Sequence, residues 1–231
     1  MSQSSESKLL TFYRSQTGRK IITGVTGIGL MGFVLVHLLG NLGFFVGSDA
    51  VNAYTAKLQA LGPLLIVVEL GLTAIVLFHA ILGMSIAMEK RKARPVGYAM
   101  QKSGGAPSRL SASSKSMIYT GVLLLVFMVV HVAQFRFGKH VETNISGHME
   151  PVRDMFIVVI ELFQNPIWVA FYVGIVLLLG FHLRHGFWSA FQSVGLLKPR
   201  LSNTVYTIGL FFALLIALGF VILPIYLHLA Y

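Results

Sequence analysis

Five long apolar stretches restrict the fold of this chain more than any other feature of its sequence. An α-helix needs about 20 predominantly apolar residues to cross a bilayer. Charged residues make up only 11% of the chain, against about 25% in soluble domains, so these stretches are not the core of a soluble protein. We predict an all-α integral membrane bundle of five transmembrane helices that forms one domain over residues 1–231. The predicted helices cover residues 20–46, 63–88, 116–137, 164–190 and 204–229.

The basic residues between these stretches predict how the chain is oriented. All but four of the 18 lysines and arginines fall on the side of the N-terminal segment and of residues 89–115. Because basic residues are enriched on the cytoplasmic side of membranes, we predict a cytoplasmic N-terminus, a cytoplasmic loop at 89–115 and a C-terminus outside. The net charge of +10 is spread over short segments between apolar runs, so no nucleic-acid surface is predicted. The four exceptions are Lys57, Arg136, Lys139 and Arg153.

The chain contains no cysteine, which limits the cofactors that it can hold by itself. Thiolate-ligated haem, covalently attached c-type haem and iron–sulfur clusters need cysteine, and so do disulfides. A redox cofactor must therefore be held by histidine or belong to a partner subunit. The polar first 18 residues predict no cleavable signal segment, and we detect neither an internal repeat nor a second soluble domain.

Four of the eight histidines, His37, His79, His131 and His182, lie inside predicted membrane helices, one in each of the first four. A single such histidine is as often a residue that forms hydrogen bonds between helices as it is a cofactor ligand. One histidine in each of four helices instead favours histidines that share the binding of a cofactor. Counting the helical rise from the predicted cytoplasmic ends places His37 and His131 about 25 Å into the bundle, and the other two about 15 Å. The histidines therefore form two pairs at two depths.

Two facing histidines at one depth are what a b-type haem iron requires, because its axial ligands approach from opposite faces of the porphyrin. The two depths differ by about 10 Å, whereas a zinc or non-haem iron site would gather its ligands at one point. Small or polar residues share the helix faces of the histidines and would let either a flat macrocycle or a neighbouring helix approach closely. They are Thr23, Thr26 and Gly40 near His37; Thr120, Gln134 and Gly138 near His131; Gly83 near His79; and Gly186 and Ser189 near His182.

Seven short segments occur in an order that resembles a known family. They are LVHLLGN around His37, LFHAILG around His79, RKARPVGY, SKSM and VVHV up to His131, and ELFQNP and GFHLRHGFWSAFQSVG up to and around His182. The set covers essentially the whole chain. It resembles the cytochrome b membrane anchor of the succinate dehydrogenase and fumarate reductase (succinate:quinone oxidoreductase) family, of the five-helix, dihaem, single-polypeptide kind.

The resemblance implies two haem b groups, the outer one held by His37 and His131 and the inner one by His79 and His182. It implies flavoprotein and iron–sulfur subunits on the cytoplasmic face of a bacterial cytoplasmic membrane, with the dicarboxylate chemistry of respiratory complex II in the flavoprotein. Electrons would pass between the iron–sulfur subunit and a membrane quinone, expected to be menaquinone. His185 is expected to bind a haem propionate or to pack, and a higher oligomer of the complex stays open.

Two acidic residues are candidates for a quinone and proton site. Glu69 is predicted about two turns inside the outer end of the second helix, where an acid is a functional candidate by default, although it lies about 80° around the helix from His79. Glu161 is predicted at the outer start of the fourth helix. The transmembrane glutamate of some fumarate reductases has no counterpart, because Gly180 lies two residues before His182. The other histidines and acids of the outer side, His140, His148, His228, Asp49, Glu142 and Asp154, are expected to be solvated.

Other functions stay open from the sequence. A fumarate reductase would run the same parts in the opposite direction, and hydrogenase or formate dehydrogenase cytochromes b also carry haem on helix histidines. A haem-free membrane anchor, or a transporter that relays protons between histidines, belongs to a different class. Transporters often have spans broken near mid-membrane, whereas Pro166 and Pro224 lie near predicted helix ends.

Overall fold

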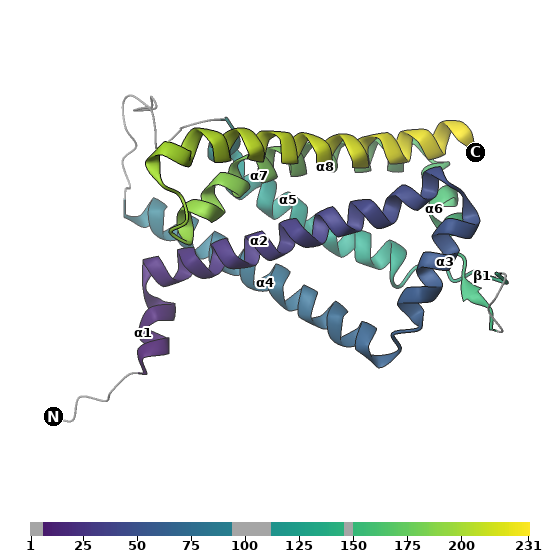
Figure 1. Ribbon diagram of the computed structural model, residues 1–231, viewed down its shortest axis with the longest axis horizontal. Helices are drawn as coiled ribbons and strands as arrows, with labels where there is room; N and C mark the ends of the chain where they lie inside the picture. Colours follow the sequence, from purple (N-terminus) through teal and green to yellow (C-terminus); the bar gives the residue numbers. More distant parts are fainter. Residues whose placement is uncertain (1–6, 94–111, 146–149) are drawn as a thin grey trace.

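The computed structural model describes residues 7–93, 112–145 and 150–231, which are almost entirely helical (Figure 1). Within these residues, five helices are long and apolar enough to cross a membrane. They coincide with the five predicted stretches, which confirms an all-α, multi-pass membrane fold. They are α2 (Gln16–Asn41), continued by the 3₁₀ helix η1 (Leu42–Phe45), α4 (Pro63–Lys92), α5 (Ala112–Phe135), α7 (Pro166–Ser193) and α8 (Ser202–Ala230).

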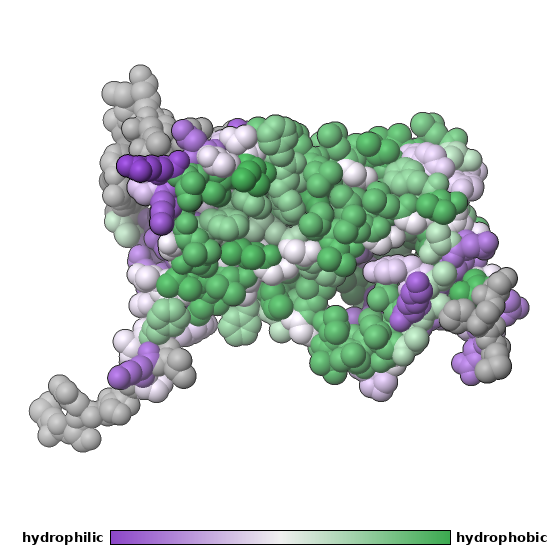
Figure 2. All heavy atoms as spheres, in the orientation of Figure 1, coloured by the Kyte–Doolittle hydropathy of each residue, from purple (hydrophilic) through white to green (hydrophobic). Residues whose placement is uncertain are grey.

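The long helices expose apolar side chains over most of their length. In α4, the most apolar window of 18 residues has no buried residue, and Val67 and Leu70 are 63% and 64% exposed. Figure 2 shows hydrophobic side chains over the middle of the bundle and hydrophilic ones gathered toward its two ends. A soluble monomer rarely exposes an apolar surface of this extent, so we place this band in lipid.

Four of the long helices form a bundle in which α7 makes the most extensive contacts. α7 packs against α2, α5 and α8, and α4 packs against α2 and α5. The order around the bundle is therefore α4, α2, α7, α5, so that α2 is diagonal to α5 and α4 is diagonal to α7. The helix α8 lies outside this ring, where Ile216 joins Met31 of α2 and Leu183 of α7 in a buried core.

Serines and prolines define where several helices begin. Ser15 ends the short helix α1 (Lys8–Arg14) and caps α2, because its Oγ accepts the Gly18 N–H at 2.9 Å. Pro63 and Pro166 lie in the first turns of α4 and α7, where the N–H that proline lacks would have no helical partner. A 3₁₀ turn, η2 (Pro199–Leu201), leads into α8. These signals place the starts of α2, α4, α7 and α8 close to the predicted ones.

Five crossings place the two termini at opposite ends of the bundle (Figure 1). We call these the N-terminal end, where α2, α5 and α8 begin, and the C-terminal end, where α4 and α7 begin. At the N-terminal end, an ion pair between Arg19 and Glu89 joins α2 to α4. The loop predicted at 89–115 is shorter than expected, because α4 continues to Lys92 and α5 begins at Ala112. Residues 94–111 lie outside the described residues.

A folded cap covers the C-terminal end of the bundle, where the sequence predicted only loops. Its helices pack Val51, Val159 and Phe163 against Tyr172 and Leu227 of the bundle. The predicted position of Glu161 at the start of the fourth helix is wrong, because Glu161 belongs to a separate helix that ends before Pro166. The cap consists of α3 (Ser48–Gln59), the antiparallel strands β1 (Glu142–Thr143) and β2 (Val152–Arg153), and α6 (Met155–Phe163).

Buried polar side chains hold the cap together. Asn52 of α3, only 2% exposed, donates to Asp154 Oδ1 at 2.9 Å and accepts the Phe156 N–H. Asp154 also caps α6 by accepting the Ile157 N–H, so its predicted solvation is wrong. Arg153 donates to the carbonyl groups of Phe135 and Lys139, both at 2.7 Å; burial, followed by the charge of Arg136, lowers its pKa.

Asn52→Ala is expected to destabilise the protein by about 1–3 kcal/mol, because it removes a buried amide together with its hydrogen bonds to Asp154 Oδ1 and the Phe156 N–H. The measurement is unfolding in mixed micelles with increasing sodium dodecyl sulfate, followed by circular dichroism. Gln59→Ala, at the exposed end of the same helix, serves as the control and should change stability by less than about 0.5 kcal/mol. Equal effects of the two substitutions would show that Asn52 does not hold α3 to α6.

Candidate functional site

The four membrane histidines form two pairs, and the two histidines of each pair come from diagonally opposite helices of the bundle. The ring centroids of His37 on α2 and His131 on α5 are 5.8 Å apart, with their planes at 87°. Those of His79 on α4 and His182 on α7 are 6.5 Å apart, at 68°. These are the two pairs expected from helix depth. We call His79 and His182, nearer the N-terminal end, the inner pair, and His37 and His131 the outer pair.

The spacing within each pair fits two imidazoles bound to opposite sides of one metal atom. Two metal–nitrogen bonds of about 2 Å, with half a ring on each side, separate the ring centroids by about 6 Å. Within the described residues there is no group of three or more His, Cys, Asp or Glu that could hold a metal ion, and a zinc site takes at least three protein ligands. Haem iron needs only axial ligands from the protein, because the porphyrin supplies the others. The donor set therefore fits haem, and ligation itself stays a prediction.

The inner pair is held by threonine hydroxyls from the two helices that flank it. Thr26 Oγ1 of α2 lies 3.2 Å from His79 Nδ1, and Thr120 Oγ1 of α5 lies 3.1 Å from His182 Nδ1. From the sequence, Thr26 was expected to share a helix face with His37, and Thr120 with His131, where a macrocycle or a helix could approach closely. In the structure each threonine contacts an inner histidine of the neighbouring helix.

Glycines give the inner histidines room. A Cβ atom on Gly27 would lie 3.2 Å from His79 Cε1, and one on Gly121 would lie 3.4 Å from His182 Cε1, so these imidazoles rest directly on the backbones of α2 and α5. Gly83 and Gly186, one turn after the inner histidines, have no atom within 4 Å of the Cβ position. Space beside both inner histidines is what a flat macrocycle between α4 and α7 would need.

Aromatic side chains surround the outer pair. His37 stacks on Phe33, with ring centroids 5.5 Å apart and planes at 15°, and Phe127 lies 5.4 Å from His131. The buried Tyr172 of α7 donates to Gln134 Oε1 at 2.6 Å, and its hydroxyl lies 3.5 Å from His131 Nδ1, a distance at which a hydrogen bond is weak. In the described part of the chain, no hydrogen bond to the ring nitrogens of His37 is present. Packing therefore orients the outer pair more than hydrogen bonds do.

The two halves of the bundle repeat the same pattern. The sequence Thr-Gly-x5-Phe-x3-His occurs at residues 26–37 in α2 and at 120–131 in α5. The sequence Phe-His-x3-Gly occurs at 78–83 in α4 and at 181–186 in α7. The threonine and the histidine of the first repeat are eleven residues apart, which is about three helical turns, or about 16 Å. They therefore share one face of α2 or α5, and this face contacts an inner histidine through the threonine and carries an outer histidine. The expectation of no internal repeat is therefore wrong, and an approximate two-fold axis relates the halves.

The remaining histidines occupy other places. His185 lies beside Trp188, with ring centroids 6.1 Å apart, and is close enough to Lys90 of α4 to interact electrostatically. His140 is exposed beside Glu142, at 3.3 Å, as predicted. His228 is partly buried and lies 2.9 Å from the Phe163 carbonyl oxygen, to which its Nδ1 donates, so its predicted solvation is wrong; His148 lies outside the described residues.

Both candidate quinone-site acids form ion pairs near the C-terminal end. Glu69 of α4 accepts from Arg136 Nε at 3.0 Å, and its side chain is 37% exposed. Arg136 lies five residues beyond His131, just after the end of α5, which places Glu69 close to the level of the outer pair. Glu161 of α6 pairs with Lys139. The two acids are separate and are not brought together into one site.

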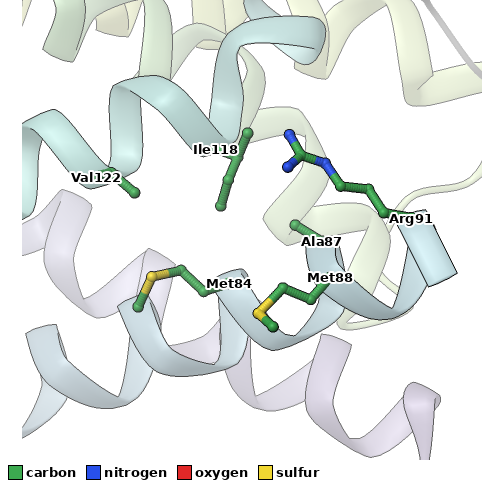
Figure 3. A pocket seen from close by; sticks show the side chains of 6 residues that line it. All are labelled: Met84, Ala87, Met88, Arg91, Ile118 and Val122. Atoms are coloured by element: carbon green, nitrogen blue, oxygen red, sulfur yellow. The ribbon is translucent and has the colours of Figure 1, made fainter.

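A pocket of about 200 Å³ lies between α4 and α5 toward the N-terminal end (Figure 3). Met84 and Met88 line it from α4, Ile118 and Val122 line it from α5, and Arg91 lies at its edge. Ile118 and Val122 are each about 160° around α5 from Thr120, so the pocket faces away from the inner pair. It takes no part in holding the histidines.

Comparisons with known proteins found no match for this chain. No protein-family model matches it, and no curated protein or solved structure matches it significantly.

The contacts of the site that were not predicted from the sequence are those of Tyr172 and of the threonines of the inner pair. Their signal was the repeat itself, since Thr26 and Thr120 occupy the same place in both copies.

Proposed function

We propose that this chain is the dihaem cytochrome b membrane anchor of a succinate:quinone oxidoreductase, respiratory complex II. The observation that carries the proposal is the presence of two bis-histidine pairs, stacked at two levels inside a five-helix membrane bundle. The chain has no cysteine, so histidine is its means of holding a redox group. The ordered motifs around the same four histidines support this family over other cytochromes b.

The residues of the pairs would have separate roles. His79 and His182 would hold the inner haem, and His37 and His131 the outer one. When bound, the two haems would supply one-electron carriers between an iron–sulfur subunit and a membrane quinone. The bundle would fix the ligand geometry and exclude water, while His185 would donate a hydrogen bond to a propionate at the N-terminal side of the inner pair and the nearby Lys90 would supply positive charge.

Charge supports the proposed orientation and partners. The N-terminal end carries most of the basic residues of the chain, which by the positive-inside rule supports a cytoplasmic location for this end; we propose that the membrane is the cytoplasmic membrane of a bacterium. In this orientation the iron–sulfur and flavoprotein subunits would dock at that end, and dicarboxylate chemistry would take place in the flavoprotein. A fumarate reductase would use the same arrangement in reverse. The basic residues of this end within the described part include Arg14, Lys20, Arg91, Lys115, Lys198 and Arg200.

The quinone, expected to be menaquinone, would react near the outer pair. Glu69 lies in the membrane helix α4 close to this level and is held by Arg136. A carboxylate at this place can exchange protons with a quinone as its redox state changes. Glu161 is the second candidate, on the cap beside Lys139.

The purified protein is expected to contain two b-type haems per chain, measured by the reduced-minus-oxidised spectrum and by haem quantification. His79→Ala or His182→Ala should remove the inner haem, and His37→Ala or His131→Ala the outer one, because each substitution leaves an axial position without its ligand. His140→Ala, in the exposed hairpin, is the control and should retain both haems. Absence of haem from the wild type would refute the proposal. Loss of one spectral component in both His37→Ala and His79→Ala would refute the pairing.

Glu69→Gln is expected to lower quinone reduction at least about 10-fold, because a positioned acid or base contributes about 10²–10⁴-fold to proton transfer. Its haem content should stay at two, since breaking an exposed ion pair changes stability by only about 0–1 kcal/mol. Turnover is measured with a soluble menaquinone analogue in the assembled complex. Glu142→Gln is the matched control, because it also removes an exposed carboxylate contact, with His140 in the hairpin, and it should leave turnover unchanged. Unchanged turnover in Glu69→Gln would remove Glu69 from the quinone site.

The absence of cysteine allows a direct test of orientation. Leu196→Cys, in the segment between α7 and α8, and Phe137→Cys, after α5, place single thiols on residues that are 64% and 77% exposed. In intact spheroplasts, a membrane-impermeant maleimide should label the thiol at position 137 and should label the one at 196 only after permeabilisation. The reverse pattern would show that the N-terminus lies outside.

A further inference from the structure

The threonine contacts of the inner pair have a defined direction. A threonine hydroxyl has one hydrogen to donate and lone pairs to accept. Thr26 directs that hydrogen to the carbonyl oxygens of Ile22 and Thr23, at 2.8 and 3.1 Å. The hydroxyl hydrogen can therefore stay within α2 while a lone pair of Oγ1 accepts a hydrogen bond from His79 Nδ1, 3.2 Å away.

The second threonine repeats this arrangement in the other half of the bundle. Thr120 directs its hydrogen to the carbonyl oxygens of Ser116 and Met117, both at 3.1 Å. A lone pair of its Oγ1 can then accept from His182 Nδ1, 3.1 Å away. A neutral imidazole that carries its proton on Nδ1 has its lone pair on Nε2. The same tautomer therefore satisfies the threonine contact of both inner histidines.

We infer that Thr26 and Thr120 are positioning residues for the inner haem: they hold His79 and His182 with Nδ1 protonated and so present both Nε2 atoms to one iron. This inference rests on the proposed function and extends it to two residues that do not touch the iron. Groups that accept from the distal N–H of a ligating histidine fix its tautomer and orientation and raise its basicity. Among the described residues, no threonine makes a comparable contact with the outer pair, and the Tyr172 hydroxyl lies 3.5 Å from His131 Nδ1.

A purely structural role would lead to a different expectation. Both hydroxyls already bond the backbone one turn earlier, so helix stability alone does not require the histidine contact. The neighbouring Gly27 and Gly121 bring each ring against the backbone beside its threonine. The same threonine, glycine and histidine arrangement in both halves therefore serves the rings. A readout at the ligand itself separates the two roles.

The test replaces each threonine by valine, which keeps the shape and removes the acceptor, in the full chain with haem bound. For Thr26→Val and Thr120→Val we expect the inner haem to bind about 10–100-fold more weakly. The g values of the ferric inner haem should shift, and its midpoint potential should rise because the ligands become less basic. The outer haem is the internal control for folding, and its spectrum and potential should not change.

Two further variants complete the experiment. Thr26→Ser and Thr120→Ser keep the hydroxyl and should restore the inner-haem signals. Thr73→Val removes an exposed hydroxyl of α4 that bonds only the Glu69 carbonyl oxygen, and it should change neither haem. If the wild type holds two haems but the valine variants leave the inner haem unaltered, or the serine variants match the valine ones, the positioning role is refuted and the proposed function stands. A wild type without haem refutes both.

Discussion

The energetic cost of placing imidazole rings in hydrocarbon is the constraint on which the interior of this protein depends. A polar side chain there is stable only if its nitrogens find partners. The structure provides them with neutral groups: two threonine hydroxyls for the inner pair, and aromatic packing with one tyrosine for the outer pair. Most charged groups lie near the ends, as in the ion pair between Arg19 and Glu89, whereas Arg184, inside α7, lies over the ring of Tyr206. One nitrogen of each inner ring is thereby committed to the protein, and the other is left available to a ligand.

The approximate two-fold axis explains why the four histidines come in symmetric pairs. The helices α2 and α5 run in the same direction and carry one repeat, and α4 and α7 run in the opposite direction and carry the other. Each pair consists of equivalent histidines from diagonal helices, so each pair meets near the bundle axis. The symmetry is broken outside the four helices: α8 covers α7 and α2 on one side only, and the cap closes the C-terminal end. These additions leave α4 as the helix most exposed to lipid.

The sequence predicted the five spans and the two histidine pairs because both depend on local quantities, namely apolar length and helical rise. It did not predict α3, α6 or the hairpin, because short amphipathic segments acquire their structure from the bundle surface on which they pack. Thr26 was correctly placed on the face of His37 by helical periodicity. Its contact with His79 was not predictable in this way, since it depends on which helix lies next to α2. The repeat was missed because only a few side chains in each copy match.

The distribution of acids indicates what can cross the bundle. The sequence has no Asp or Glu in residues 16–45, 70–88, 112–135, 166–193 or 202–230, so Glu69 and Glu89 stand near opposite ends of α4 with no carboxylate between them. Such a bundle offers electrons two stacked levels but offers protons no carboxylate relay. In the proposed orientation, an electron that moves from the inner to the outer pair travels toward the positive side of an energised membrane. The potential favours this movement by about 2.3 kcal/mol per 100 mV for a full crossing, so it would assist quinone reduction at the outer side and oppose the reverse reaction.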